Sequence, residues 1–215
     1  LLTGLSKDPR ASLKGGLYHA EEAILNLNLV QSLKKPAGFF DPSNPLNERL
    51  SNEDKEDEEE KPLAERSRNS RSPMLSFSNT DMAFSGNVMV AGSYHGFNIY
   101  NLDNQGHAKL VSSVICPGGQ GDVSIVGNLL IMSVEQNRGR IDCGLQGAGT
   151  EPNPERFRGI RIFDISDLKR PQQVGAVQTC RGSHTHSVVS GPDENGIIIV
   201  YNSGTSSVRD QEELE

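Results

Sequence analysis

The chain has 215 residues, a hydrophobic share of 34%, and 22 glycines but no tryptophan. This hydrophobic share is low for a chain that packs along its whole length, so we expect part of it to lie outside any folded core. The formal net charge of -7 argues against the basic face that binds nucleic acid. Apolar runs fall well short of the about 20 residues that a membrane-spanning helix needs, so no membrane-spanning segment is predicted.

The N-terminal part, residues 1–41, is predicted to contain one amphipathic helix. Residues 20–35 read AEEAILNLNLVQSLKK, with apolar side chains mostly at helical spacing. Acidic residues near the start and two lysines at the end suit the helix dipole, and Pro36 ends the pattern. We expect this helix to dock on a larger body, because its polar face has too few basic residues for a membrane-surface helix.

Residues 42–73 are predicted to form a disordered acidic linker. Prolines, asparagines and serines surround the run NEDKEDEEE at residues 52–60. Such a composition buries too little apolar surface to offset the entropy lost on ordering. We interpret the run as a solvated tether, and the alternative is that its carboxylates bind a cation or a basic partner.

From residue 74 onward, the pattern predicts short β-strands separated by turns. DMAFSGNVMVAGSY at residues 81–94 matches DVSIVGNLLIMSVE at residues 122–135, including the Gly-Asn turn. GFNIYNLDNQGHAKLVSSVIC, which starts at Gly96, likewise matches GIRIFDISDLKRPQQVGAVQTC, which starts at Gly159. Each unit thus has four strands in about 40 residues, which is the spacing of a β-propeller blade.

The predicted fold class is therefore all-β, an incomplete β-propeller of four-stranded repeats. Its units lie near residues 81–121, 122–185 and 186–215, and the third is truncated after its second strand. A ring needs about four to eight blades, so we expect the remaining blades in a missing C-terminal part, or alternatively in another chain. The second unit carries a Gly- and Pro-rich insertion at residues 137–158, which predicts a long functional or mobile loop.

The repeat text GIRIFDISDLKRPQQVGAV at residues 159–177 resembles the LVIVD repeat. That repeat has a glycine, an apolar strand that runs into Asp-Ile-Ser-Asp, a proline and a strand that contains Val-Gly. The matching positions are Ile160, Ile162, Phe163, Asp164, Ile165, Ser166, Asp167, Pro171, Val174 and Gly175. The copy at residues 96–114 departs from the pattern, with Asn101 in place of the aspartate and no proline.

This resemblance covers residues 81 to about 203, and it implies a β-propeller of the secreted bacterial type, exported and associated with the cell surface. Residues 8–42 similarly resemble the leader that precedes such repeats in secreted members. The repeat motif contains no catalytic residue, so the resemblance implies no particular reaction. Because the first residue is Leu1, we expect a processed or truncated chain, in which a missing signal peptide says nothing about localisation.

Four polar residues are predicted to lie near one another at the mouth of the propeller channel. Asp81, Asp122 and His186 begin the first strand of three successive units, and that strand lines the channel of a propeller. In a strand, His184 would face the same way as His186. Carboxylates and imidazoles from neighbouring blades are ligands for a divalent metal such as Zn, Cu or Mn. The alternative is that they line a hydrated polar channel.

The three cysteines are compatible with an oxidising or a reducing compartment. Cys116 and Cys180 occupy the same place in two units, and Cys143 lies in the insertion. A disulfide from Cys143 to Cys180 or to Cys116 would pin the glycine-rich loop. The alternatives are unpaired buried thiols or a nucleophilic cysteine.

These features favour a secreted or cell-envelope interaction module over an enzyme. Its binding surface is predicted to include the loops between blades and the insertion at residues 137–158, and its partner to be a protein or a surface ligand. The competing hypothesis is a metal-dependent propeller enzyme in which His184 and His186 are the first ligands.

Overall fold

The computed structural model describes residues 8–16, 19–40, 78–148 and 152–213. The chain divides into two compact units, Leu1–Leu33 and Lys34–Glu215, and the described strands all belong to the second. The acidic linker predicted at residues 42–73 lies outside the described residues.

The amphipathic helix predicted at residues 20–35 is not formed, so that prediction is wrong. Leu25 and Leu27 are 82% and 77% exposed, and Asn26 between them has a left-handed φ of 58°. A short helix gains most of its stability by packing an apolar face against the rest of the protein. The described leucines of this segment stay about half exposed or more, so helical spacing alone does not fold it.

The helix that the described part of the first unit does contain is a single 3-10 turn, η2 (Pro9–Ser12). Asp8 caps it, because its carboxylate accepts a hydrogen bond from the backbone N–H of Arg10 at 2.9 Å. Proline at the first position of the turn has no N–H to satisfy, which suits the start of a helix.

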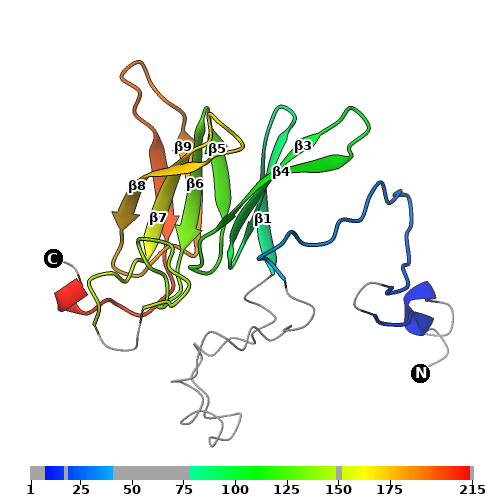
Figure 1. Cartoon of the computed structure of the whole chain (residues 1–215), viewed down its shortest axis with the longest axis horizontal. Coiled ribbons are helices and arrows are strands. Elements are labelled where there is room, and N and C mark those ends of the chain that lie inside the picture. The colour runs from blue at the N-terminus through cyan, green and yellow to red at the C-terminus, as the bar shows by residue number, and fades with distance from the viewer. Residues whose placement is uncertain (1–7, 17–18, 41–77, 149–151, 214–215) are drawn as a thin grey trace, which may run out of the picture. The chain divides into compact units, whose positions relative to one another are not determined.

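Two four-stranded antiparallel sheets of the same strand order make up most of the second unit (Figure 1). The first sheet consists of β1 (Asn79–Ser85), β2 (Val88–Ser93), β3 (Gly96–Leu102) and β4 (Ala108–Ile115). The second consists of β5 (Val123–Val126), β6 (Leu129–Val134), β7 (Gly159–Asp164) and β8 (Gln172–Gln178). These strands follow the predicted pattern, and the insertion joins β6 to β7.

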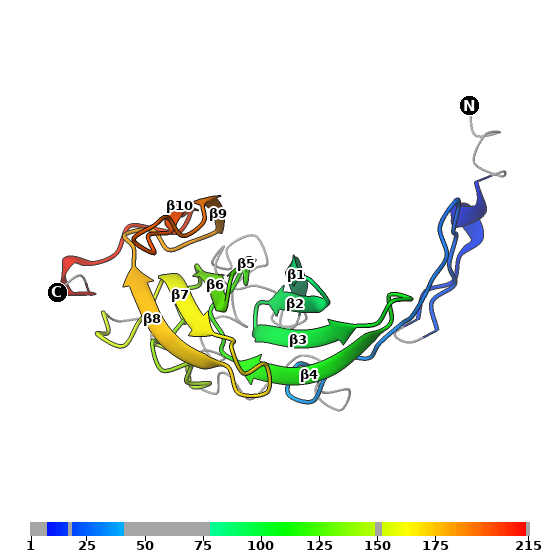
Figure 2. The same ribbon diagram turned by 90° about the horizontal axis from the view of Figure 1, so that it is seen from above.

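A third, smaller sheet pairs β9 (Thr185–Ser190) with β10 (Ile199–Ser203), and the 3-10 turn η5 (Gln211–Glu213) follows it. The all-β prediction is therefore confirmed, whereas the described strands do not close into a barrel. Seen from above, β1, β5 and β9 lie on one side of the sheets, and β4 and β8 lie on the opposite side (Figure 2). The first strand of one sheet is thus the neighbour of the first strand of the next.

Both large sheets have a glycine of positive φ at the same place, where their third strand begins. Gly96 and Gly159 open β3 and β7 with φ of 135° and 154°. A Cβ atom at Gly96 would lie 2.0 Å from the carbonyl oxygen of Val114, and one at Gly159 would lie 2.0 Å from that of Val177. Only glycine fits so close to the neighbouring backbone, which explains the glycine in both sequence blocks.

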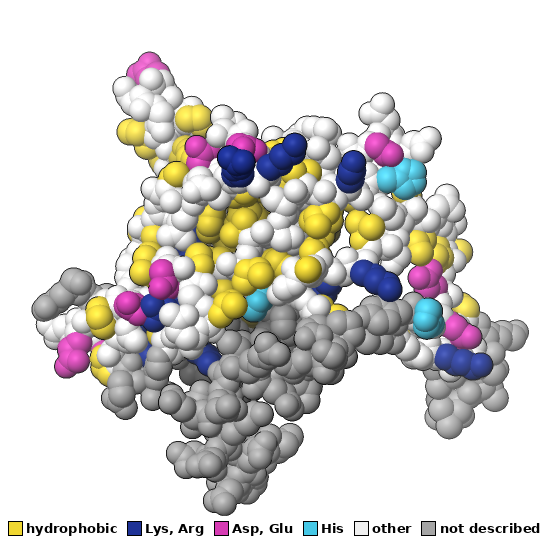
Figure 3. Space-filling model, viewed as in Figure 1, with side chains coloured by type: hydrophobic (Ala, Val, Ile, Leu, Met, Phe, Trp, Pro, Cys, Tyr) yellow, Lys and Arg dark blue, Asp and Glu magenta, His cyan; other side chains and the backbone are white. Residues whose placement is uncertain are grey.

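The core of the second unit lies between the two large sheets. Phe97 and Phe163 meet edge to face, with ring centroids 4.9 Å apart. Val90, Ile99, Cys116, Val123, Leu130, Met132 and Ile165 complete the buried cluster. Other apolar side chains stay exposed, and Figure 3 shows several gathered over the middle of the face in view.

Candidate functional site

The predicted channel residues form a hydrogen-bonded chain that passes from sheet to sheet. The carboxylate of Asp81 accepts a hydrogen bond from the backbone N–H of Val123, at 3.1 Å, on the first strand of the second sheet. The carboxylate of Asp122 accepts one from the backbone N–H of His186, at 2.7 Å, on the first strand of the third sheet. Each aspartate therefore ties its own sheet to the next one.

His186 makes several of these hydrogen bonds, and its side chain is fully buried. Its Nδ1 is 2.9 Å from a carboxylate oxygen of Asp122 and 2.8 Å from the hydroxyl of Ser133, which in turn is 2.7 Å from the hydroxyl of Ser183. Burial raises the pKa of Asp122, but the hydrogen bonds from His186 outweigh it and bring the pKa below its ordinary value. The Nε2 of His186 has no hydrogen-bond partner among the described residues.

This geometry differs from that of a Ser-His-Asp catalytic triad. In a triad, the aspartate holds Nδ1 while Nε2 takes the proton of the serine hydroxyl. Here Asp122 and Ser133 both contact the Nδ1 of His186, and Nε2 faces neither. The contact between a serine hydroxyl and Nε2 that defines a triad is therefore not formed by Ser133.

His184 belongs to a second polar group beside the first. It lies just before β9, and its Nδ1 is 2.7 Å from a carboxylate oxygen of Glu135 and 3.0 Å from the side-chain nitrogen of Gln120. The other carboxylate oxygen of Glu135 accepts hydrogen bonds from the backbone N–H of Thr205, at 2.9 Å, and from its hydroxyl. Burial raises the pKa of Glu135, yet the bonds from Thr205 and His184 leave that pKa lowered.

The structure therefore brings Asp81, Asp122 and His186 together and places His184 in an adjoining group. No three histidine, cysteine, aspartate or glutamate side chains in the described ranges form a group able to hold a metal ion. Metal binding by these residues stays a prediction. Sequence reasoning missed Glu135, although an acid directly after the apolar strand β6 was a visible signal.

The predicted disulfide between Cys143 and Cys180 is wrong, because Cys143 is bonded to Cys116 and Cys180 is a free, exposed cysteine. Cys116 directly follows β4. Cys180 follows β8, where its carbonyl accepts a hydrogen bond from the backbone N–H of Arg209 at 3.1 Å. The disulfide of Cys143 thus ties the insertion to the end of β4 through Cys116, and not to the end of β8 through Cys180.

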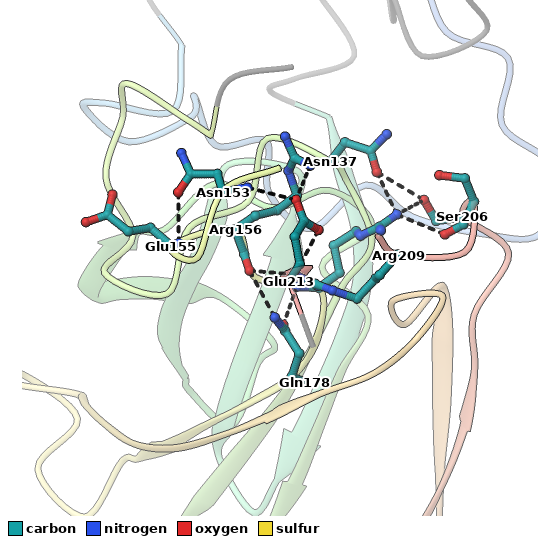
Figure 4. A network of polar contacts seen from close by, with 10 residues as sticks. Asn137, Asn153, Glu155, Arg156, Gln178, Ser206, Arg209 and Glu213 are labelled. Atoms are coloured by element: carbon teal, nitrogen blue, oxygen red, sulfur yellow. Dashed lines mark hydrogen bonds and ion pairs between the residues drawn. The ribbon is translucent and has the colours of Figure 1, made fainter. Parts of the chain in front are cut away.

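Buried arginines hold the base of the insertion, and the sequence prediction did not include them. Figure 4 shows Arg156 and Arg209 pointing toward the carboxylate of Glu213, which follows the third sheet. The backbone N–H of Asn153 donates to the same carboxylate at 3.1 Å. Arg158 nearby donates to the side-chain oxygens of Asn137 and Ser206, each at 2.7 Å, and it is also buried.

A fourth arginine, Arg140, links the two arms of the insertion. The guanidinium of Arg140 is largely buried, and it forms ion pairs with Asp142, at 2.8 Å, and with Glu155. Its hydrogen bonds hold the pKa of Asp142 well below the ordinary range. Arg140 and Arg156 also form an isolated antiparallel bridge, which joins the two arms of the insertion. The arms are thus fixed to each other as well as to the sheets.

No helix in the described part of the chain is long and apolar enough to cross a membrane. The resemblance to LVIVD repeats stays a prediction. In comparisons with known proteins, no family model, no curated protein and no solved structure matches this chain.

Proposed function

We propose that this chain is a secreted or cell-envelope interaction module of the β-propeller type, and that the insertion at residues 137–158 is part of its binding surface. The observation that carries the proposal is a loop that is held by a disulfide and ion pairs and presents apolar side chains. Ile141 and Leu145 flank the disulfide-bonded Cys143 and are 41% and 50% exposed.

The propeller assignment rests on the way in which the large sheets are built. Both have the strand order of a propeller blade, and both carry a β-bulge in the pairing of their third and fourth strands, after Ile99 and after Ile162. Their first strands are neighbours, as they are around a propeller channel. The aspartates that bond to the next sheet supply a repeated link between blades.

The disulfide supports a location outside the reducing cytosol. Bonds such as Cys116–Cys143 form and persist mainly in secreted and envelope compartments. A loop held by a covalent bond and buried ion pairs loses little conformational entropy when it binds, so it suits recognition. Since Asp142 and Glu155 leave no net positive charge at Arg140, the exposed apolar side chains favour a protein surface as the partner.

This proposal is tested by photo-cross-linking on intact cells of the source organism. A photoreactive residue replaces Leu145 in one protein and Val208, which is 63% exposed outside the insertion, in a matched control. We expect a discrete adduct from position 145 only, and Ile141→Ser should abolish it. Equal labelling from both positions would contradict the proposal.

The alternative function is a metal-dependent propeller enzyme with His184 and His186 as ligands. The observation that favours it is the buried Nε2 of His186, which has no hydrogen-bond partner among the described residues, on an imidazole that already contacts the carboxylate of Asp122. Elemental analysis of protein purified without added metal tests this alternative. Stoichiometric zinc, copper or manganese that His186→Ala removes would support it, and metal-free wild-type protein would rule it out.

A further inference from the structure

Arg161, in β7, is fully buried against the disulfide. Its Nη1 contacts the Sγ of Cys116, and it lies 3.3 Å from the carbonyl oxygen of Cys116 and 3.4 Å from that of Pro117. Its Nη2 donates to the carbonyl oxygen of Arg140, and the guanidinium carbon lies 5.3 Å from the ring centroid of Phe157. All of these partners are uncharged.

The cation of Arg161 is therefore buried without a carboxylate among its hydrogen-bond partners. Its Nε has no partner among the described residues. Burial lowers the pKa of Arg161 to about 10, opposed only by the charge of Asp142, so the guanidinium stays protonated at neutral pH. Taking an uncompensated charge out of water is costly, which makes any nearby group that can become an anion a favourable neighbour.

Among the groups that Arg161 contacts, the sulfur of Cys116 is the one that can become an anion, when the disulfide is broken. A thiol next to a guanidinium has a lowered pKa, and a thiol of low pKa is a better leaving group in thiol–disulfide exchange. The two ends of the bond also differ in access. Cys116 is fully buried, whereas Cys143 is only partly buried, on the insertion.

We propose that the Cys116–Cys143 disulfide is a thiol–disulfide exchange site for a dithiol reductant. One thiolate of the reductant attacks the Sγ of Cys143 and forms a mixed disulfide, and the Cys116–Cys143 bond breaks. Cys116 leaves with the electron pair as a thiolate that Arg161 stabilises. The second thiol of the reductant, as its thiolate, then displaces Cys143, so the reductant is oxidised by two electrons and the protein bond is reduced.

Exchange at this site would release one anchor of the insertion and leave others in place. The bridge between Arg140 and Arg156 and the ion pairs of Arg140 do not involve sulfur. The reduced insertion is therefore expected to stay folded back on the sheets while the segment around Cys143 gains freedom. The exchange chemistry does not depend on the insertion being a binding surface, so it can be tested separately from the proposed function.

The decisive measurement is the pKa of the Cys116 thiol in the full chain carrying Cys143→Ser and Cys180→Ser, followed by thiolate ultraviolet absorbance against pH. We expect a value between about 3.5 and 7.5, compared with about 8.5 for an ordinary cysteine. Adding Arg161→Met should return the value to the ordinary range, and Arg161→Lys should retain part of the decrease. A pKa at or above about 8.5 in the protein that keeps Arg161 would overturn the proposal, even if the Arg161 variants fail to fold.

A second experiment identifies the sulfur that is attacked. Protein carrying Cys180→Ser is treated with glutathione, quenched in acid and mapped by peptide mass spectrometry. We expect the mixed disulfide on Cys143, and full reduction of the folded protein by dithiothreitol without denaturant. Attachment at Cys116, or a bond that dithiothreitol reduces only after unfolding, would contradict the proposal.

Discussion

At the scale of single residues, Asp122 makes more contacts to the neighbouring sheet than its counterpart Asp81. Asp81 accepts a hydrogen bond from one backbone N–H, whereas Asp122 also holds the buried imidazole of His186. We expect Asp122→Ala to lower the free energy of unfolding by about 1–3 kcal/mol, because two buried donors lose their acceptor. Urea unfolding measures the loss, and Asp81→Ala is the matched control with a smaller expected effect. An equal or larger loss in the control would contradict the assigned roles.

The lowered pKa values of Asp122 and Glu135 give the protein a predictable pH dependence. Their ordinary values are 3.8 and 4.5, and both are lower in the folded state. Their contribution to stability is complete above the ordinary values, where both states are ionised. As the pH falls, the unfolded chain takes up protons first, so the contribution decreases and is lost below the folded-state pKa values.

We therefore expect the urea midpoint of the wild type to fall as the pH decreases from about 5 to about 3. Glu135→Gln should flatten this dependence, because its side chain cannot titrate. Glu194→Gln changes an exposed glutamate in the β9–β10 connection and should keep the wild-type slope. Equal slopes for the wild type and Glu135→Gln would show that Glu135 does not contribute.

The histidines show what a sequence pattern can predict about a site and what it cannot. Strand alternation predicted that His184 and His186 share a side, and their partners Glu135 and Ser133 are themselves two positions apart in the chain. The pattern does not reveal that each imidazole has a separate partner, because those partners come from another sheet. The sequence likewise did not show whether Cys143 pairs with Cys116 or with Cys180, because the pairing depends on the path of the insertion in space.

At the scale of elements, the glycines that open β3 and β7 give the sharpest test. Gly159→Ala would place Cβ 2.0 Å from the carbonyl oxygen of Val177, at a φ of 154°. We expect a loss of about 1–3 kcal/mol in the free energy of unfolding, measured by urea denaturation. Gly175→Ala in β8 is the control, because its Cβ would meet only Ile162 at 3.6 Å. A similar loss at both positions would contradict this explanation.

Local turn signals explain why the strands could be predicted from the sequence, whereas the helix prediction failed. The Gly86–Asn87 and Gly127–Asn128 turns fix local geometry, because both glycines have a φ of 58° and connect adjacent antiparallel strands. Such signals act within a few residues. Residues 20–35 carry a helical pattern too, but a helix there requires a packing surface, which no local sequence pattern supplies.

At the scale of the whole molecule, the sheets differ in how well they cover one another. The second strands β2 and β6 are largely buried, since each has a strand on both sides and a neighbouring sheet. The corresponding strand of the third sheet, β10, pairs with β9 alone in the described part of the chain. Its side chains are correspondingly exposed, including Tyr201 at 68%.

An unpaired strand edge with apolar side chains is a template for pairing with another chain. We therefore expect the 215-residue chain to associate reversibly as its concentration rises, through β10. Tyr201→Lys should weaken the association, because a charge on an edge strand disfavours further strand addition.

Val208→Lys, at a position that is 63% exposed but outside any strand, is the matched control. Sedimentation velocity over a concentration series measures the effect. A wild type that stays monomeric throughout, or an equal effect of both lysines, would show that the β10 edge does not drive association.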